Sequence, residues 1–283
     1  MASRRTAVLS LEIGQLAARG IVVLAGSLLV LLLGLPLAAL VIRVPPATLL
    51  ARLGQPEVLE ALRLSLFTSA CSTAAVVLLG LPVAHLLATR EFRGKRLLEL
   101  LIDVPMVLPP TVAGVGLLLA FGRAGLAGGV LRMFGLSLPF TTLAVIVAQL
   151  YVATPFFVSS ATAGFLSVEP RYLESAATHR ASPFYTFLHV TLPLSAPSLL
   201  AGAAMGWARA LGEFGATITF AGNLPGRTQT MPLAVYVALQ SDVDAAVTLS
   251  VLLLAVSLVI LLGLRVLPGV TITRGILAFR RGR

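Results

Sequence analysis

Charged residues are scarce in this sequence, since Asp, Glu, Lys and Arg make up 11% of the 283 residues while apolar residues make up 58%. A soluble globular protein has about 25% charged residues, because its surface faces water. So few charges exclude an ordinary soluble domain, and so many apolar residues exclude a disordered chain. The composition predicts a polytopic membrane protein.

Cysteine is nearly absent as well, and Cys71 is the single one. One cysteine cannot form a disulfide within the chain and cannot build a cysteine-based metal site. The sequence also lacks a GxxxxGK[ST] phosphate-binding loop, an HExxH motif and a nucleophile–base–acid set in its hydrophilic loops. These absences predict a protein that is not itself an enzyme and that has no metal site and no cofactor of its own.

Long runs without Asp, Glu, Lys or Arg are abundant. A helix that crosses a bilayer needs about 20 mostly apolar residues, and six runs are long enough. We therefore expect residues 1–283 to form one all-α polytopic domain, with an amphipathic segment at residues 51–63 before the second span. The six transmembrane helices are expected at residues 21–42, 64–89, 104–122, 141–164, 186–208 and 245–264.

Basic residues outnumber acidic ones by 21 to 11, and their distribution predicts the orientation. An even number of spans leaves both termini on one side of the membrane, and basic residues collect in cytoplasmic loops. With the termini inside, 14 basic residues fall in inner segments and seven in outer ones. This predicts cytoplasmic termini and explains the positive charge without nucleic acid as a partner.

The predicted inner loop at residues 168–185 contains a short polar helix rich in small residues. Glu169-Pro170 suits the first turn of a helix, and Ser182-Pro183 is expected to end it before a second helix begins. A polar helix between two spans has no core of its own to cover. It either docks a cytoplasmic partner or simply connects the spans, and the pattern alone leaves both interpretations open.

Helix-breaking and ionisable residues also occur at predicted membrane depth. Arg209 and Glu213 are four residues apart, so they are expected to share a helical face and pair. The prolines either line a cavity or only kink a helix that packs in the bundle. The charged residues either face a cavity or form a structural ion pair inside the bundle. The candidates for a translocation pathway or gate are Pro109, Pro110, Thr111, Arg209, Glu213, Gly215 and Ala216.

Residues 168–194 resemble the EAA loop of ABC importer permeases, which reads Glu-Ala-Ala, three residues, Gly, and a segment closed by Leu-Pro. Leu192-Pro193 closes the motif here, but Arg180 stands where the family has Gly. Because Arg is unfavourable at positive φ, either the turn forms differently or the helix continues. The resemblance implies that the ATPase-coupling residues are Glu174, Ser175, Ala176, Ala177, Arg180, Ser182 and Pro183.

Residues 103–128 and 207–236 resemble molybdate ABC transporter permeases, above all in ALGEFGAT, FAGN and PGRTQT. The resemblance implies the type I ABC importer permease (MetI-like) fold and a homodimer in a bacterial or archaeal cytoplasmic membrane. It implies two kinds of partner: a cytoplasmic ABC ATPase dimer, which binds the ATP, and an extracytoplasmic molybdate-binding protein. The implied cargo is molybdate and tungstate. The alternatives are a sulfate or thiosulfate permease and an ion-coupled secondary transporter.

Overall fold

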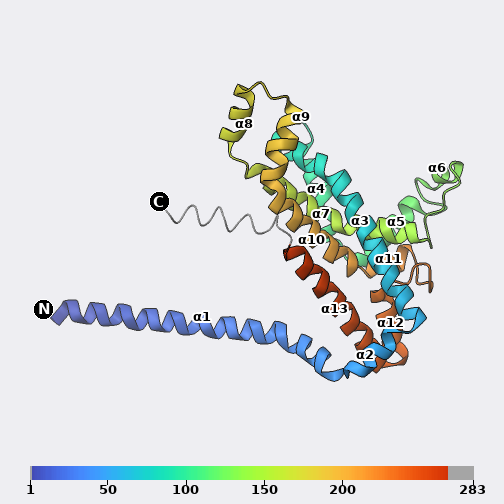
Figure 1. The fold of residues 1–283 in the computed structure, drawn as a ribbon, viewed down its shortest axis with the longest axis horizontal. Helices are drawn as coiled ribbons and strands as arrows, with labels where there is room; N and C mark the ends of the chain where they lie inside the picture. The colour runs from blue at the N-terminus through green and yellow to red at the C-terminus, as the bar shows by residue number, and fades with distance from the viewer. Residues whose placement is uncertain (1, 267–283) are drawn as a thin grey trace. The chain divides into compact units, whose positions relative to one another are not determined.

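The computed structural model describes the backbone of residues 2–266 and the side chains of residues 19–263 (Figure 1). All regular elements in this part of the chain are helical. The chain divides into two units, Met1–Leu50 and Ala51–Arg283. The first unit is dominated by helix α1 (Ala2–Arg43), whose apolar part Arg19–Arg43 is long enough to cross a membrane.

Helix α2 (Pro46–Leu53) lies at the boundary between the units, and the second unit contains the remaining helices. They are α3 (Pro56–Thr89), α4 (Lys95–Val107), α5 (Pro110–Phe121), α6 (Gly128–Met133), α7 (Thr142–Leu166), α8 (Pro170–Thr178), α9 (Pro183–Thr186), the π-helix η1 (Phe187–Thr191), α10 (Leu192–Leu211), α11 (Gly215–Phe220), α12 (Met231–Ser241) and α13 (Val243–Val266).

Five of the six predicted spans coincide with helices long and apolar enough to cross a membrane, but the third does not. Residues 104–122 are not one helix, because α4 ends at Val107 and α5 begins at Pro110. Leu108 and Pro109 are extended, as expected for residues that precede a proline. The 12 residues of α5 cover only about 18 Å, less than the ~30 Å hydrocarbon core. The third predicted span is therefore a pair of short helices with a break between them, and the expected count of six continuous spanning helices is not exact within the described residues.

Residues 51–63, where an amphipathic segment was expected before the second span, are divided between two helices. The short helix α2 ends at Leu53, and Pro56 begins α3, which continues without interruption to Thr89. Proline suits this place because the first backbone N–H groups of a helix have no partner within it. The second span therefore has a long extension at its N-terminal end.

The core of the second unit is a bundle of α3, α7 and α10, which pack along their lengths (Figure 1). Glycines allow this close approach. A Cβ atom at Gly80 would lie 2.9 Å from the ring of Phe157, and one at Gly202 would lie 2.8 Å from Cβ of Ser160. Membrane helices associate by van der Waals packing, so small residues at their contacts stabilise the bundle.

Buried hydroxyl groups of α3 add polar contacts to this packing. The indole N–H of Trp207 on α10 donates to Oγ of Ser69 over 3.1 Å, and the backbone N–H of Met231 donates to Oγ of Ser65 over 2.7 Å. Both serines are fully buried. These bonds hold α10 and the start of α12 at fixed heights along α3.

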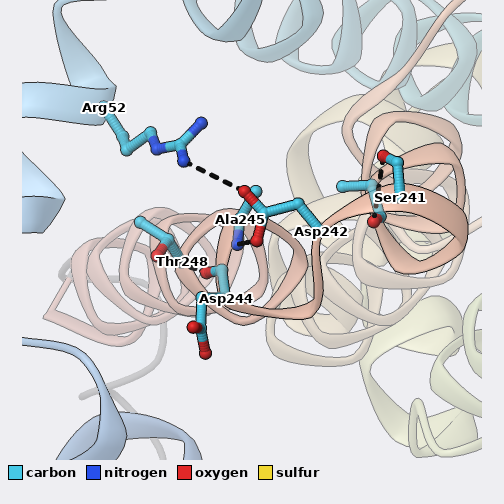
Figure 2. Close-up of polar contacts among 7 residues, drawn as sticks. Arg52, Ser241, Asp242, Asp244, Ala245 and Thr248 are labelled. Atoms are coloured by element: carbon cyan, nitrogen blue, oxygen red, sulfur yellow. Dashed lines mark hydrogen bonds and ion pairs between the residues drawn. The ribbon is translucent and has the colours of Figure 1, made fainter.

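The junction between α12 and α13 is fixed by Asp242, which lies just outside the membrane-spanning part of α13 (Figure 2). Its carboxylate accepts the backbone N–H of Ala245 over 3.0 Å and pairs with Arg52 over 3.3 Å. The hydrogen bond from Ala245, followed by weaker effects that include the Arg52 guanidinium, holds the pKa of Asp242 below its usual value. Asp242 thus caps α13 and ties it to the end of α2.

Arg180 forms the turn after α8 in the left-handed conformation, with φ of 56°. The N–H of Ala181 donates to the carbonyl of Ala176 over 3.0 Å, and the N–H of Arg180 donates to that of Ala177 over 2.9 Å. This pair of bonds is a Schellman motif, which usually has glycine at the left-handed position. Both outcomes expected for this turn are therefore wrong, because the helix ends here with an arginine held at positive φ.

Replacement of Arg180 by glycine is expected to stabilise the end of α8. The left-handed conformation costs an L-residue about 1–2 kcal/mol, and glycine avoids most of that cost. We expect the Arg180→Gly variant to slow hydrogen exchange of the last α8 amides by roughly fivefold. The control is Arg171→Gly in the first turn of α8, which should speed exchange because glycine has a lower helix propensity than arginine. Equal or faster exchange in Arg180→Gly would show that the turn is not strained.

Candidate functional site

The predicted coupling residues lie on one protruding segment formed by α8, the following turn and α9. Glu174, Ser175, Ala176 and Ala177 are on α8, Arg180 is in the turn, and Ser182 and Pro183 begin α9. No residue of α8 is buried, and Phe184 and Tyr185 on α9 are exposed as well. A segment with no buried residue on α8 and with exposed aromatic rings on α9 is suited to contact another molecule.

Local contacts give this segment a defined shape. Oγ of Ser182 accepts the backbone N–H of Tyr185 over 3.2 Å, so it caps α9 as the Ser-Pro pair predicts. At the other end, Glu169 pairs with Arg171 over 2.7 Å at the start of α8. Each short helix is therefore closed by its own residues, and the segment can act as a preformed surface.

The pathway candidates come together where α5 packs against α11. A Cβ atom at Gly215 would lie 2.7 Å from Cβ of Pro110 and 3.1 Å from the backbone nitrogen of Thr111. One turn along, a Cβ atom at Gly114 would lie 2.9 Å from Cα of Ala216. Pro109 precedes this contact in the extended break between α4 and α5. The break in the third predicted span thus lies against the break between α10 and α11.

The predicted pair of Arg209 and Glu213 is confirmed, with 2.5 Å between the guanidinium and the carboxylate. Glu213 is only 1% exposed, so this arginine forms a largely buried ion pair with it. The carboxylate also accepts the backbone N–H of Ala216 over 2.7 Å. Because α10 ends at Leu211, Glu213 lies beyond that helix and joins its end to the start of α11. The contacts describe a structural joint, and a role of this pair in the pathway stays a prediction.

The FAGN and PGRTQT motifs form a loop whose role the sequence analysis did not identify. Gly222 and Gly226 have φ of 74° and 71°. A Cβ atom at Gly222 would lie 2.9 Å from the ring of Phe140, and the Thr142 hydroxyl donates to the carbonyl of Arg227 over 2.9 Å. Fully buried Thr228 accepts the N–H of Leu224 over 2.9 Å. The two glycines were the available signal for a loop fixed by its own backbone.

The chain matches the model of one protein family over most of its described length. Residues 77–267 match the family described as "Binding-protein-dependent transport system inner membrane component". This range begins within α3 and includes the protruding segment and both helix breaks.

Relatives of known name extend this similarity. The chain is 44% identical over 234 residues to the molybdenum transport system permease protein ModB of Mycobacterium tuberculosis, covering 83% of this chain and 89% of the relative. It is 35% identical over 246 residues to the molybdate/tungstate transport system permease protein WtpB of Pyrococcus furiosus, covering 86% and 92%. It is 34% identical over 241 residues to the sulfate transport system permease protein CysT of Escherichia coli, covering 84% and 87%.

The fold agrees with that of solved importers. A chain of a bacterial ABC transporter involved in the import of the acidic polysaccharide alginate superposes with a TM-score of 0.69 at 16% identity, covering 86% of this chain and 92% of that one. The type I ABC importer permease fold implied by the sequence motifs is thereby confirmed. The family match, together with relatives that align over most of this chain, shows that the chain belongs to the binding-protein-dependent transport system inner membrane components.

Proposed function

We propose that this chain is the membrane-spanning permease subunit of an ATP-driven importer of molybdate, and of tungstate as a second cargo. The observation that carries the proposal is the identity to a named molybdenum permease, which is higher than the identity to a named sulfate permease. Tungstate follows because its size and charge are nearly those of molybdate, and because a named molybdate/tungstate permease is also a relative. The chain itself does not hydrolyse ATP in this proposal.

The working assembly contains two copies of this chain, a cytoplasmic ABC ATPase dimer and an extracytoplasmic binding protein. The anion crosses between the two copies at their two-fold axis. The α4–α5 pair counts as one broken crossing in this assembly, so that both termini and the α8–α9 segment lie on the cytoplasmic side, where the ATPase binds. The exposure of this segment supports the assignment, because docking would cover surface that the chain itself leaves open.

The transport mechanism starts from closure of the ATPase pair, which moves the docked α8–α9 segment. The apolar helical stretch Pro183–Leu211 continues from α9 through η1 and α10 to the joint of Arg209 and Glu213. Displacement of the α9 end of this stretch reaches α11, which packs on α5 at the break between α4 and α5. The bundle then switches between inward-open and outward-open arrangements. The dianion passes polar backbone and hydroxyl groups without a tight permanent site, since tight binding would slow release.

The proposal is tested by the ATPase activity of the complex in liposomes. The chain is reconstituted with its ATPase subunit and supplied with binding protein loaded with molybdate, tungstate or sulfate. We expect molybdate and tungstate to stimulate hydrolysis and sulfate to leave it at the basal rate. Stimulation by sulfate alone would overturn the cargo while preserving the assembly. Failure of the ATPase to associate would overturn the proposed docking.

Changes on α8 are expected to uncouple ATP hydrolysis from uptake. Glu174→Lys reverses a charge, and Ala176→Trp adds bulk at a small residue, so either should disturb docking without unfolding the bundle. We expect uptake to fall at least about tenfold, which corresponds to a loss of about 1.4 kcal/mol. Glu57→Lys at the start of α3 is the control for charge reversal and should transport normally. Full uptake and normal ATPase assembly in both α8 variants would contradict the docking assignment.

Loss of Arg209 is expected to weaken folding or dimer assembly rather than change the cargo. Arg209→Ala leaves the buried Glu213 carboxylate without its cation, which costs about 3–5 kcal/mol. We expect a lower melting temperature in detergent and an unchanged order of anion preference. Addition of Glu213→Gln to this variant should recover part of the loss, and Arg132→Ala at an exposed position of α6 should have little effect. Normal yield with altered anion preference would place Arg209 in the pathway instead.

A further inference from the structure

Three aromatic rings from three helices meet at one end of the bundle. The ring of His85 on α3 lies 5.2 Å from that of Phe165 on α7, edge to face, and 4.7 Å from that of Phe187 in η1. The rings of Phe165 and Phe187 are 6.1 Å apart. These distances are those of favourable aromatic pairs. We call His85, Phe165 and Phe187 the aromatic triad.

Two members of the aromatic triad flank the protruding segment, one before it and one after it. Phe165 is at the end of α7, directly before the chain leaves for α8, and Phe187 is the first residue of η1, directly after α9. Since no residue of α8 is buried, the segment is held by the residues that flank it. His85 contacts both flanking rings and comes from α3, a helix that does not belong to the segment.

The His85 ring is held by packing rather than by a hydrogen bond. Its Nδ1 is buried and has no hydrogen-bond partner among the described residues. His85 also borders a hollow of about 480 Å³ whose other lining residues, Pro82, Leu86, Thr89 and Arg90, come from α3. The ring can therefore follow the two phenylalanine rings without breaking a hydrogen bond of Nδ1 to a described residue.

The helix that carries Phe187 is locally widened. The backbone N–H of Leu192 donates to the carbonyl of Phe187, which is the five-residue spacing of a π-helix. Pro193 accounts for this, because its ring lacks an N–H and would clash with the carbonyl of His189 in a regular α-helix. Widened turns of this kind occur frequently at functional sites.

We propose that the aromatic triad is the positioning link that transmits movement of the α8–α9 segment to the membrane bundle. This inference rests on the proposed docking of the ATPase at that segment. When the segment moves, Phe187 moves with the widened turn, and its contact with His85 carries the displacement to α3. Phe165 holds His85 from the other side, so α3 and α7 respond together.

The test measures molybdate uptake and ATP hydrolysis in the same proteoliposomes, with the complete complex and its binding protein. The variants are His85→Ala, Phe187→Ala and the milder Phe187→Leu, which keeps apolar volume but removes the ring. His85→Phe keeps a ring, so it should behave like the original chain. Phe67→Ala, an exposed ring elsewhere on α3, is the matched control for loss of an aromatic side chain.

We expect the ring-deleting variants to co-purify with the ATPase and to hydrolyse ATP, while uptake per ATP falls about fivefold. A complex that is only less stable would lose uptake and hydrolysis in proportion, so the ratio of uptake to ATP hydrolysis would stay the same. An unchanged ratio in Phe187→Leu would therefore overturn the proposed role of the aromatic triad. An unchanged ratio in assembled His85→Ala and Phe187→Ala would overturn it as well. Failure of the unmodified chain to bind the ATPase would overturn the docking and this inference together.

Discussion

Close approach of backbones at small residues is the constraint on which the rest of this structure depends. Positions such as Gly80, Gly114, Gly202 and Gly215 have neighbours so near that a single Cβ atom would meet them at 2.7–2.9 Å. In a membrane, packing of this kind must hold helices together, because lipid chains are as apolar as the helices themselves. The α3–α7–α10 bundle and the contact of α5 with α11 are both built in this way.

This packing connects the two ends of the molecule that matter for the proposed transport. The segment that protrudes from the bundle continues into the stretch Pro183–Leu211, which ends at the buried pair of Arg209 and Glu213. Glu213 also holds the first turn of α11, which packs on the break before α5. The aromatic triad adds a second connection, from the same protruding segment to α3. A continuous helical stretch and a ring contact therefore lead from the proposed docking surface into the bundle.

Several parts of the fold and of the candidate site were predictable from the sequence, because they depend on local rules. Apolar runs located five spanning helices, and the spacing of Arg209 and Glu213 predicted their ion pair. Two spans had wrong limits. The second spanning helix begins at Pro56, although charged residues led us to expect its start further along the chain. Pro110 begins a new helix inside an apolar run whose hydropathy suggests one span. Arg180 shows the opposite case, since the surrounding hydrogen bonds impose a conformation that its own preference disfavours.

The sequence by itself determined the class of the molecule, its family motifs and most of its helices, since apolar length and proline position act within a short stretch of chain. Only the tertiary structure decided which breaks face each other, that Gly215 lies on Pro110, and that His85 meets Phe165 and Phe187. These contacts join residues far apart in the chain. Their partners are set by how whole helices pack, and no local pattern of residues specifies that packing.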